Sequence, residues 1–178
     1  MRSGPSGEIM KSFRALLALT AFFAGGLAAE PDDPLASAMR DAQRLVECMK
    51  AFDPECTAAL TYTKFAEDRG MPREQMVQAV TDLHGKLKSV GAKYTLFDLS
   101  TPTGPYSGYG REYVFVPYSQ ILEAGQRQGR VRAFLIGVSV DGGRSWQFVD
   151  GLAATPAAIK AVMPSYAGQP LPPVGPLE

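Results

Sequence analysis

Four polar side chains interrupt apolar runs in the second half of the chain, and they are the candidates for acid–base chemistry. They are Asp98, Glu112, Tyr118 and Arg132. A carboxylate that a cavity desolvates has its pKa raised toward neutrality, and it then serves as a general acid or base beside a tyrosine. Asp98 is therefore the first acid to test.

Each of these residues also has a purely structural interpretation. Charged groups at strand ends normally reach solvent, and Glu112 and Arg132 can form a cross-strand ion pair that contributes only tenths of a kcal/mol. A buried tyrosine such as Tyr118 usually packs in the core with one hydrogen bond. The sequence thus contains no coherent catalytic set.

The chain holds one histidine and two cysteines, which are too few for a four-ligand His/Cys zinc site, a haem pair or an iron–sulfur cluster. We therefore expect no metal and no cofactor. His84 lies beside Leu83 and between Asp82 and Lys86, at the polar edge of a predicted amphipathic helix, and we expect it to face solvent. No G-x-S-x-G elbow accompanies it, so we do not assign it to a Ser-His-Asp assembly.

Cys48 and Cys56 lie at the end of one predicted helix and the start of the next. An oxidising compartment lets such a pair form a disulfide, and the alternative is two small buried thiols. A C-x-x-C redox spacing is absent. We expect the disulfide rather than a catalytic thiol.

Residues 139–146, SVDGGRSW, match the Asp-box pattern of sialidase-like propellers. The pattern describes a tight hairpin: Asp141 can accept hydrogen bonds from turn amides, Gly142 and Gly143 accept positive φ, and Trp146 packs back on the sheet. A propeller needs several four-stranded blades, whereas this chain has one copy of the motif. We interpret these residues as a structural turn.

Residues 10–29 have the layout of a secretory signal peptide, in which Lys11 and Arg14 precede an apolar stretch that ends in small residues at Ala29. The stretch holds about 15 residues, fewer than the roughly 20 that a spanning helix needs. No cysteine for lipid attachment lies near the cleavage region. The sequence predicts a periplasmic or secreted protein with no membrane span after cleavage, starting from either Met1 or Met10.

The 178 residues are 46% hydrophobic and 20% charged, with 18 basic and 18 acidic side chains, which suits one globular domain. Removal of the signal peptide, residues 1–29, takes away three basic side chains and one acidic, leaving 15 against 17 and a net charge of −2. Nucleic-acid binders need clustered basic residues to neutralise phosphates. We therefore expect no nucleic-acid partner.

Apolar residues recur at spacings of three and four in the first half of the chain, which predicts three amphipathic helices. Asp-Pro pairs at Asp33 and Asp53 read as an N-cap followed by the first helical residue, and Gly91 stands where a left-handed residue ends the third helix. The expected apolar sides are Leu35, Met39, Ala42, Val46 and Met49; Ala58, Ala59, Tyr62, Phe65 and Ala66; and, after Pro72, Met76, Val80, Leu83, Leu87 and Val90.

From Ala92 onward the apolar period changes to two, which predicts a four-stranded antiparallel meander. Both faces of the third strand are apolar, so we expect it to be central. A short helix starts at Thr155, and residues 164–178 form a flexible proline-rich tail behind a single α+β domain of residues 30–163. The predicted strands are KYTLFDL (93–99), REYVFVPYS (111–119), RVRAFLIGVSV (130–140) and RSWQFV (144–149).

Three helices followed by a meander resemble the NTF2-like α+β roll over residues 33–152. LVECMKAFDPECTAALTYTKFAE, EQMVQAVTDLHGKL and the strands through FLIGVS and WQFVDG carry the resemblance, while the family's strand between the second and third helices is not evident around EDRGMPRE. A cystatin-like or other helix-on-sheet sandwich fits the same order. The resemblance implies a cavity between sheet and helices, used by some members for small molecules or acid–base chemistry and by others for protein association.

The sequence supports three functions. The first is an exported, non-catalytic domain that binds a partner protein or a small apolar ligand. The second is a small cavity enzyme of isomerase, lyase or hydrolase type that uses Asp98 and tyrosines. The third is a structural component of the cell envelope, for which the proline-rich tail is the only indication.

Overall fold

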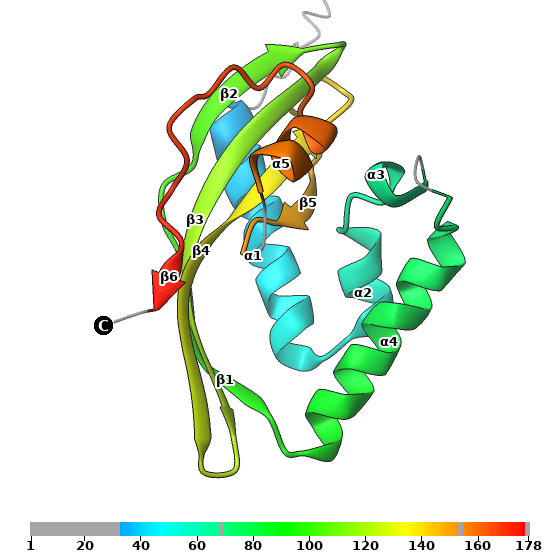
Figure 1. Cartoon of the computed structure of the whole chain (residues 1–178), viewed down its shortest axis with the longest axis vertical. Helices are drawn as coiled ribbons and strands as arrows, with labels where there is room; N and C mark the ends of the chain where they lie inside the picture. Colours follow the sequence, from blue (N-terminus) through cyan, green and yellow to red (C-terminus); the bar gives the residue numbers. More distant parts are fainter. Residues whose placement is uncertain (1–32, 68–69, 153–154, 177–178) are drawn as a thin grey trace, which may run out of the picture.

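The structure is a computed structural model that describes residues 33–67, 70–152 and 155–176; the predicted signal peptide lies outside these ranges. The predicted α+β class is confirmed, with helices α1 to α4 beside an antiparallel sheet and the short α5 near β5 (Figure 1). The helices are α1 (Pro34–Ala51), α2 (Pro54–Ala59), α3 (Lys64–Glu67), α4 (Arg73–Ser89) and α5 (Pro156–Val162), and the strands are β1 (Lys93–Leu99), β2 (Thr103–Gly108), β3 (Arg111–Ala124), β4 (Arg127–Ser139), β5 (Gln147–Asp150) and β6 (Gly175–Pro176).

The predicted helix starts are confirmed at three places, each with proline at the first helical position. Asp33 caps α1 by accepting a hydrogen bond from the Leu35 amide at 3.0 Å. Asp53 caps α2 through the Cys56 amide at 3.0 Å, and the Thr155 hydroxyl caps α5. These side chains satisfy backbone donors that have no partner inside the helix.

The second predicted helix is wrong in length, because α2 ends at Ala59 instead of continuing through Ala66. The chain that follows pairs with β5: the Tyr62 amide donates to the Phe148 carbonyl at 2.9 Å, and the Phe148 amide donates to the Leu60 carbonyl at 2.8 Å. A helix through Tyr62 would leave this side of β5 unpaired. Pairing with the sheet therefore overrides local helix propensity, and the helix resumes only as the short α3.

Helix α4 begins after Pro72 and is followed by Gly91 at φ 64°, as predicted. Its buried face differs from the predicted one. Leu83 and Val90 are 55% and 58% exposed, whereas His84, which we expected in solvent, is only 6% exposed. The His84 ring packs edge-on against Phe52 with ring centroids 5.7 Å apart, because α4 rests on the turn between α1 and α2 rather than on the sheet.

The sheet runs in the order β1-β3-β4-β5, with β2 pairing to β3 and β6 pairing to β4. The four predicted strands are present, and β4 is central as expected. Strand β2 was missed because its sequence, TGPYSG, is rich in residues that are depleted in strands. It forms as the partner of β3 across a turn in which Tyr109 and Gly110 both have positive φ.

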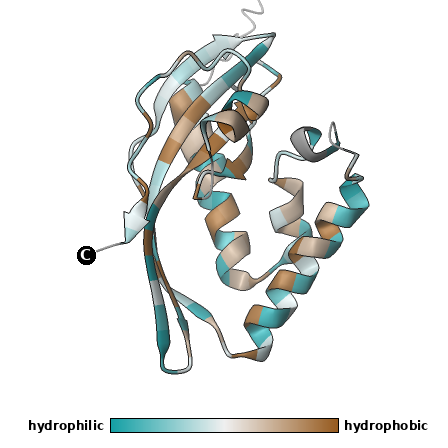
Figure 2. Ribbon diagram, in the orientation of Figure 1, coloured by the Kyte–Doolittle hydropathy of each residue, from teal (hydrophilic) through white to brown (hydrophobic). Residues whose placement is uncertain are grey.

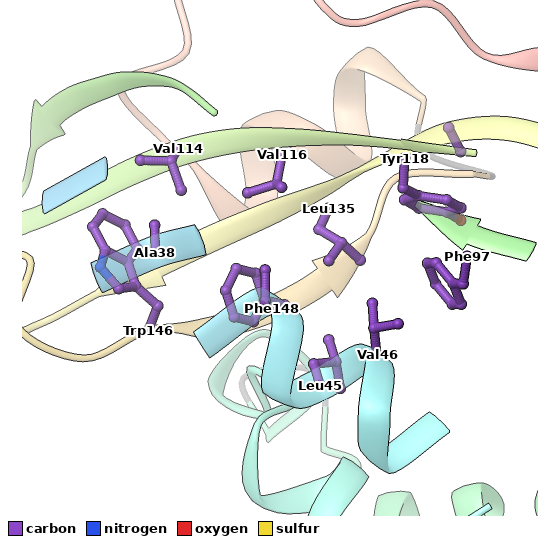
Figure 3. Close-up of a cluster of buried hydrophobic side chains, with 12 residues drawn as sticks. Ala38, Leu45, Val46, Phe97, Val114, Val116, Tyr118, Leu135, Trp146 and Phe148 are labelled. Carbon is purple, nitrogen blue, oxygen red and sulfur yellow. The ribbon is translucent and has the colours of Figure 1, made fainter. Parts of the chain in front are cut away.

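Two apolar clusters cover the two faces of β4. Ala133 and Leu135 point to the inner cluster under α1, while Phe134 and Ile136 point to the outer cluster under α5. Figure 3 shows the inner cluster between α1 and the sheet. Figure 2 shows that the turn end of the β3–β4 hairpin, away from this cluster, is mainly hydrophilic. The core therefore occupies the part of the sheet that helices cover.

The proline-rich tail contributes an element that its composition did not predict. Gly175 and Pro176 form β6 beside Arg132 and Val131 of β4. Tyr166 and Leu171 pack against the outer cluster, and the tail runs along the sheet in Figure 1. In the described part of the chain, no helix is both long enough and apolar enough to cross a membrane.

Candidate functional site

The four candidate acid–base residues do not come together. Asp98 and Arg132 are exposed. Asp98 of β1 and Arg132 of β4 stand on either side of Ser119 of β3 in the sheet. Glu112 accepts hydrogen bonds from the Ser107 hydroxyl at 2.9 and 2.7 Å. Of the four, Tyr118 alone is buried in the inner cluster.

The strand register excludes the cross-strand pair that was the structural alternative for Glu112 and Arg132. In the β3–β4 register Glu112 stands opposite Ser139, and Arg132 stands opposite Ser119. The two charged residues thus lie at distant points of the long hairpin. The sequence pattern located the strands but did not determine their register, that is, which residues stand opposite each other.

A cavity of about 220 Å³ lies between the N-terminal helices and the inner face of the sheet. Helix α1 supplies one wall, α2 and the segment after it a second, Met76 of α4 a third, and the sheet the floor. Its surface is predominantly apolar. The lining residues are Leu45, Met49, Thr57, Thr61, Tyr62, Met76, Phe97, Tyr118, Leu135, Phe148, Val149 and Asp150.

One corner of the cavity is polar because Tyr118 meets Asp150 there. The Tyr118 hydroxyl donates to Asp150 Oδ1 at 3.0 Å, and the Leu152 amide donates to the same oxygen at 2.8 Å. Burial, and then the Asp150 carboxylate, raise the pKa of Tyr118 far above its ordinary value. The phenol therefore stays protonated and acts as a hydrogen-bond donor to Asp150.

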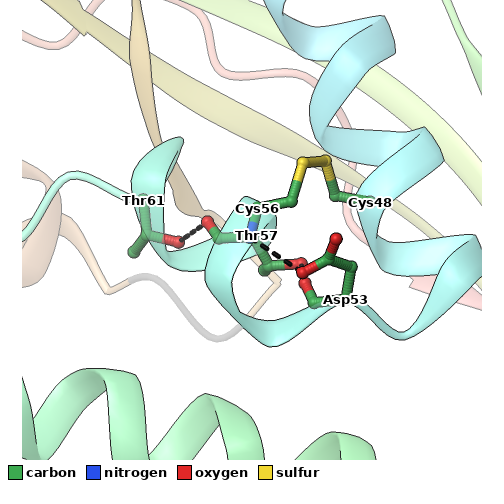
Figure 4. The surroundings of a disulfide bond; sticks show 5 residues. All are labelled: Cys48, Asp53, Cys56, Thr57 and Thr61. Carbon is green, nitrogen blue, oxygen red and sulfur yellow. Dashed lines mark hydrogen bonds between the residues drawn. A yellow bond between two sulfur atoms is a disulfide. The ribbon is translucent and has the colours of Figure 1, made fainter.

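The threonines of the cavity wall use their hydroxyl protons within the protein. Thr57 donates to the Asp53 carbonyl at 2.7 Å and Thr61 donates to the Thr57 carbonyl at 2.8 Å (Figure 4). Their hydroxyl oxygens keep lone pairs for a further hydrogen bond. These side chains can therefore accept hydrogen bonds from a ligand but cannot donate one in this arrangement.

Sequence reasoning missed Asp150, which stands at the end of β5 in the segment WQFVDG. Asp150 lies opposite Leu135 of β4, and this places its carboxylate within reach of Tyr118 two strands away on β3. No local sequence pattern predicts this contact between Tyr118 and Asp150. A strand-end carboxylate beside apolar residues was the available signal, and the sequence offers several of those.

The predicted disulfide between Cys48 and Cys56 is present, with Cα atoms 5.6 Å apart (Figure 4). Phe52 ends α1 with φ 51°, and the Asp53 amide donates back to the Cys48 carbonyl at 2.9 Å. The turn is thus closed by a covalent bond and by backbone hydrogen bonds. The bridge holds α2, and with it Thr57, beside the cavity.

The turn of residues 139–146 is built as its pattern predicts. Asp141 Oδ1 accepts hydrogen bonds from the amides of Arg144 and Ser145 at 3.1 and 3.0 Å, and Ser145 Oγ donates to Oδ2 at 2.6 Å. The Ser145 hydroxyl is the largest cause of a pKa for Asp141 well below the ordinary value. The carboxylate is committed to the turn.

The same turn also anchors α1, which the sequence did not predict. Trp146 Nε1 donates to Ser37 Oγ at 2.9 Å, and the Trp146 amide donates to Asp41 Oδ2 at 2.9 Å. Ser37 in turn donates to the Gly143 carbonyl. The motif therefore fixes the helix that forms one wall of the cavity.

Within the described ranges, no group of three or more His, Cys, Asp or Glu side chains is placed to hold a metal ion. The cavity with its Tyr118–Asp150 corner is therefore the candidate ligand-binding site. No protein-family model matches this chain, and no curated protein is significantly similar to it.

Proposed function

We propose that this protein is an exported, non-catalytic binding domain that takes a small apolar molecule into the cavity between its N-terminal helices and the sheet. The observation that carries the proposal is a cavity of about 220 Å³ with a predominantly apolar lining. Ligand sites are typically concave and mostly apolar, with a few polar groups that orient the ligand. This cavity has that character, since its one polar corner is the Tyr118–Asp150 pair.

The cavity volume limits the ligand. An apolar cavity of about 150 Å³ binds benzene, and pockets for drug-sized ligands start at about 300 Å³. The present volume lies between these values. It suits a single aromatic ring with a short substituent, or a short alkyl chain.

The walls suit such a guest. Met49 and Met76 are unbranched and adapt their shape to what they contact, while Phe97 and Phe148 supply aromatic surface. Burial of apolar ligand surface is worth about 25 cal/mol per Å² before the entropic costs of binding. A cavity between helices and sheet is also what the resemblance to the NTF2-like roll implies.

Export is the second part of the proposal, and two features support it. The sequence begins with a signal-peptide pattern, and the Cys48–Cys56 disulfide suits an oxidising compartment such as the periplasm or the cell exterior. The proposed ligand is thus met outside the cytoplasm.

The cavity-enzyme alternative would have to use Tyr118 and Asp150, because these are the polar groups that meet in the cavity. Asp98, the acid first considered for this role, lies instead beside α1 in a separate polar groove with Glu47 and Lys50. Tyr118 stays protonated and donates its proton to Asp150, so it is not available as a base in this arrangement.

Occlusion of the cavity tests the proposal. We would measure binding of indole, 2-phenylethanol and 1-hexanol by isothermal titration calorimetry to the mature protein and to Met76→Trp, whose indole would fill the cavity. Met71→Trp is the matched control, because Met71 is 45% exposed and lies outside the lining.

We expect at least one probe to bind the mature protein and Met71→Trp and to lose measurable binding to Met76→Trp. Binding that survives in Met76→Trp would place the ligand elsewhere. No binding of any probe to the mature protein would remove the basis of the proposed function.

A further inference from the structure

The hydrogen-bonding character of the cavity selects among small apolar molecules. Among the described residues that line it, Asp150 is the only one with a charged side chain, and it is acidic. A ligand with a carboxylate would bring like charge to this corner without a lysine or arginine to receive it. A cationic head group would meet a carboxylate instead.

Three of the four hydroxyl groups of the lining reinforce this selection. Thr57, Thr61 and Tyr118 each donate their proton to a protein oxygen, at 2.7, 2.8 and 3.0 Å respectively. Each oxygen is left as an acceptor. These three side chains therefore offer acceptors and no free donor, which complements a group that only donates.

Asp150 has room for such a group. Both of its hydrogen bonds, from the Tyr118 hydroxyl and the Leu152 amide, end on Oδ1, and in the described part of the chain no hydrogen bond reaches Oδ2. Asp150 is an exposed residue. A head group placed there keeps part of its hydration, which avoids the large cost of burying a charge completely.

We propose that the ligand is a small hydrophobic amine, whose apolar body occupies the cavity and whose ammonium group binds Asp150 Oδ2 and the Tyr118 hydroxyl oxygen. This inference rests on the proposed binding function and adds the chemical class of the ligand. The ammonium has donors only, so it matches the acceptors of this corner. The nearby aromatic rings of Phe97 and Tyr118 suit either an aryl or an alkyl body.

Three probes with nearly the same apolar body test the inference: 2-phenylethylamine, 2-phenylethanol and phenylacetate, titrated calorimetrically near neutral pH. We expect the amine to bind about tenfold more tightly than the alcohol, as a hydrogen bond to a charged group gains over a neutral one. Phenylacetate should bind most weakly.

Asp150→Asn removes the charge while its amide oxygen can still accept from Leu152 and Tyr118. It should lower the preference for the amine over the alcohol about tenfold. Asp98→Asn is the matched control, since it removes an exposed carboxylate outside the cavity and should leave this preference unchanged. Tyr118→Phe gives an independent test should Asp150→Asn fail to fold, because it removes one acceptor and keeps the ring, and it should also weaken the amine selectively.

The outcomes separate the two proposals. If 2-phenylethanol binds and is blocked by Met76→Trp, but the amine binds no more tightly, the cavity function stands and the amine inference is overturned. An amine preference that persists in Asp150→Asn, or that falls equally in Asp98→Asn, also overturns it. If no probe binds, both proposals fail.

Discussion

The carboxylate of Asp141 stabilises its turn because both of its oxygens accept hydrogen bonds from neighbouring residues. It receives the amides of Arg144 and Ser145 and the hydroxyls of Ser139 and Ser145. A carboxylate that accepts several hydrogen bonds is favoured in its charged form, which is why its pKa is lowered. At this position the charge stabilises the turn.

Replacement of Asp141 by alanine should therefore lower the free energy of unfolding by about 1–3 kcal/mol, because the turn donors lose their acceptor. Chemical denaturation measures the change. Asp98→Ala, at an exposed carboxylate, is the control and should have little effect. A loss of ligand binding in Asp141→Ala at unchanged stability would contradict this structural role.

His84 should make the stability of the folded protein sensitive to acid. Desolvation by burial lowers the pKa of His84, and the nearby Lys88 adds to the effect, while a hydrogen bond to the Phe52 backbone and the Asp53 charge oppose it. The unfolded chain therefore binds a proton on this histidine more readily than the folded protein does. Stability that is present above the unfolded pKa of about 6.5 is lost as the pH falls below it.

We expect the melting temperature to fall between about pH 7 and pH 5, and His84→Leu to reduce this slope. Leucine keeps an apolar group against Phe52 without a titrating proton. Calorimetric melting at several pH values makes the comparison. An equal slope in both proteins would assign the acid sensitivity to other groups.

At the scale of elements, two local devices position the helices that form the cavity. The disulfide closes the hairpin between α1 and α2, and the Asp141 turn fastens α1 through Ser37 and Trp146. Helix α4 has fewer such ties, since it packs mainly on α2 and presents Leu83 and Val90 to solvent.

Reduction of the Cys48–Cys56 bond should destabilise the protein by about 2–3 kcal/mol, the loop-closure entropy of a short loop in the chain-entropy model. Thermal melting with and without reductant measures it. A Cys48→Ser/Cys56→Ser variant should melt like the reduced protein and should not respond to reductant. Two thiols titrating in denatured, unreduced mature protein would contradict the bridge.

Ser37 and Trp146 should be energetically coupled. Trp146→Ala removes a buried ring and should cost about 3–5 kcal/mol, while Ser37→Ala leaves the ring in place and should cost about 1 kcal/mol. In a double-mutant cycle with Trp146→Phe, we expect a coupling energy of about 0.5–1.5 kcal/mol. Additive effects would mean that the hydrogen bond does not help to anchor α1.

At the scale of the whole molecule, both faces of the sheet carry a packed apolar cluster, and the cavity lies beside one of them. The sheet is covered on one face by α1 and on the other by α5 and the tail, with the two clusters sharing β4. The cavity lies on the α1 side. One domain thus contains both the packed core and the proposed binding site.

Export with cleavage after Ala29 predicts a mature chain that begins at Glu30. Intact mass measurement of the protein recovered from the periplasm or the medium tests this. Replacement of Leu16 and Leu17 by charged residues should keep the protein in the cytoplasm with its thiols reduced. A mature chain that still begins at Met1 or Met10 would contradict the localisation.

Much of the fold was predictable because its signals are local. The Asp-Pro pairs at Asp33 and Asp53 cap helices through amides two or three residues away. The bridge from Cys48 to Cys56 and the turn around Asp141 also join near neighbours in the chain. In each case the interacting groups lie within one turn or one short loop, so residue type and spacing suffice.

The break after α2, the burial of His84 and the candidate site were decided by the tertiary structure. The segment after Ala59 gives up helix because it finds backbone partners on Phe148, far along the chain. Tyr118 reaches Asp150 only because the register of β3, β4 and β5 places their rows together. Sequence periodicity shows which side of an element is apolar, but it does not show which rows meet, because that depends on how the whole sheet packs against its helices.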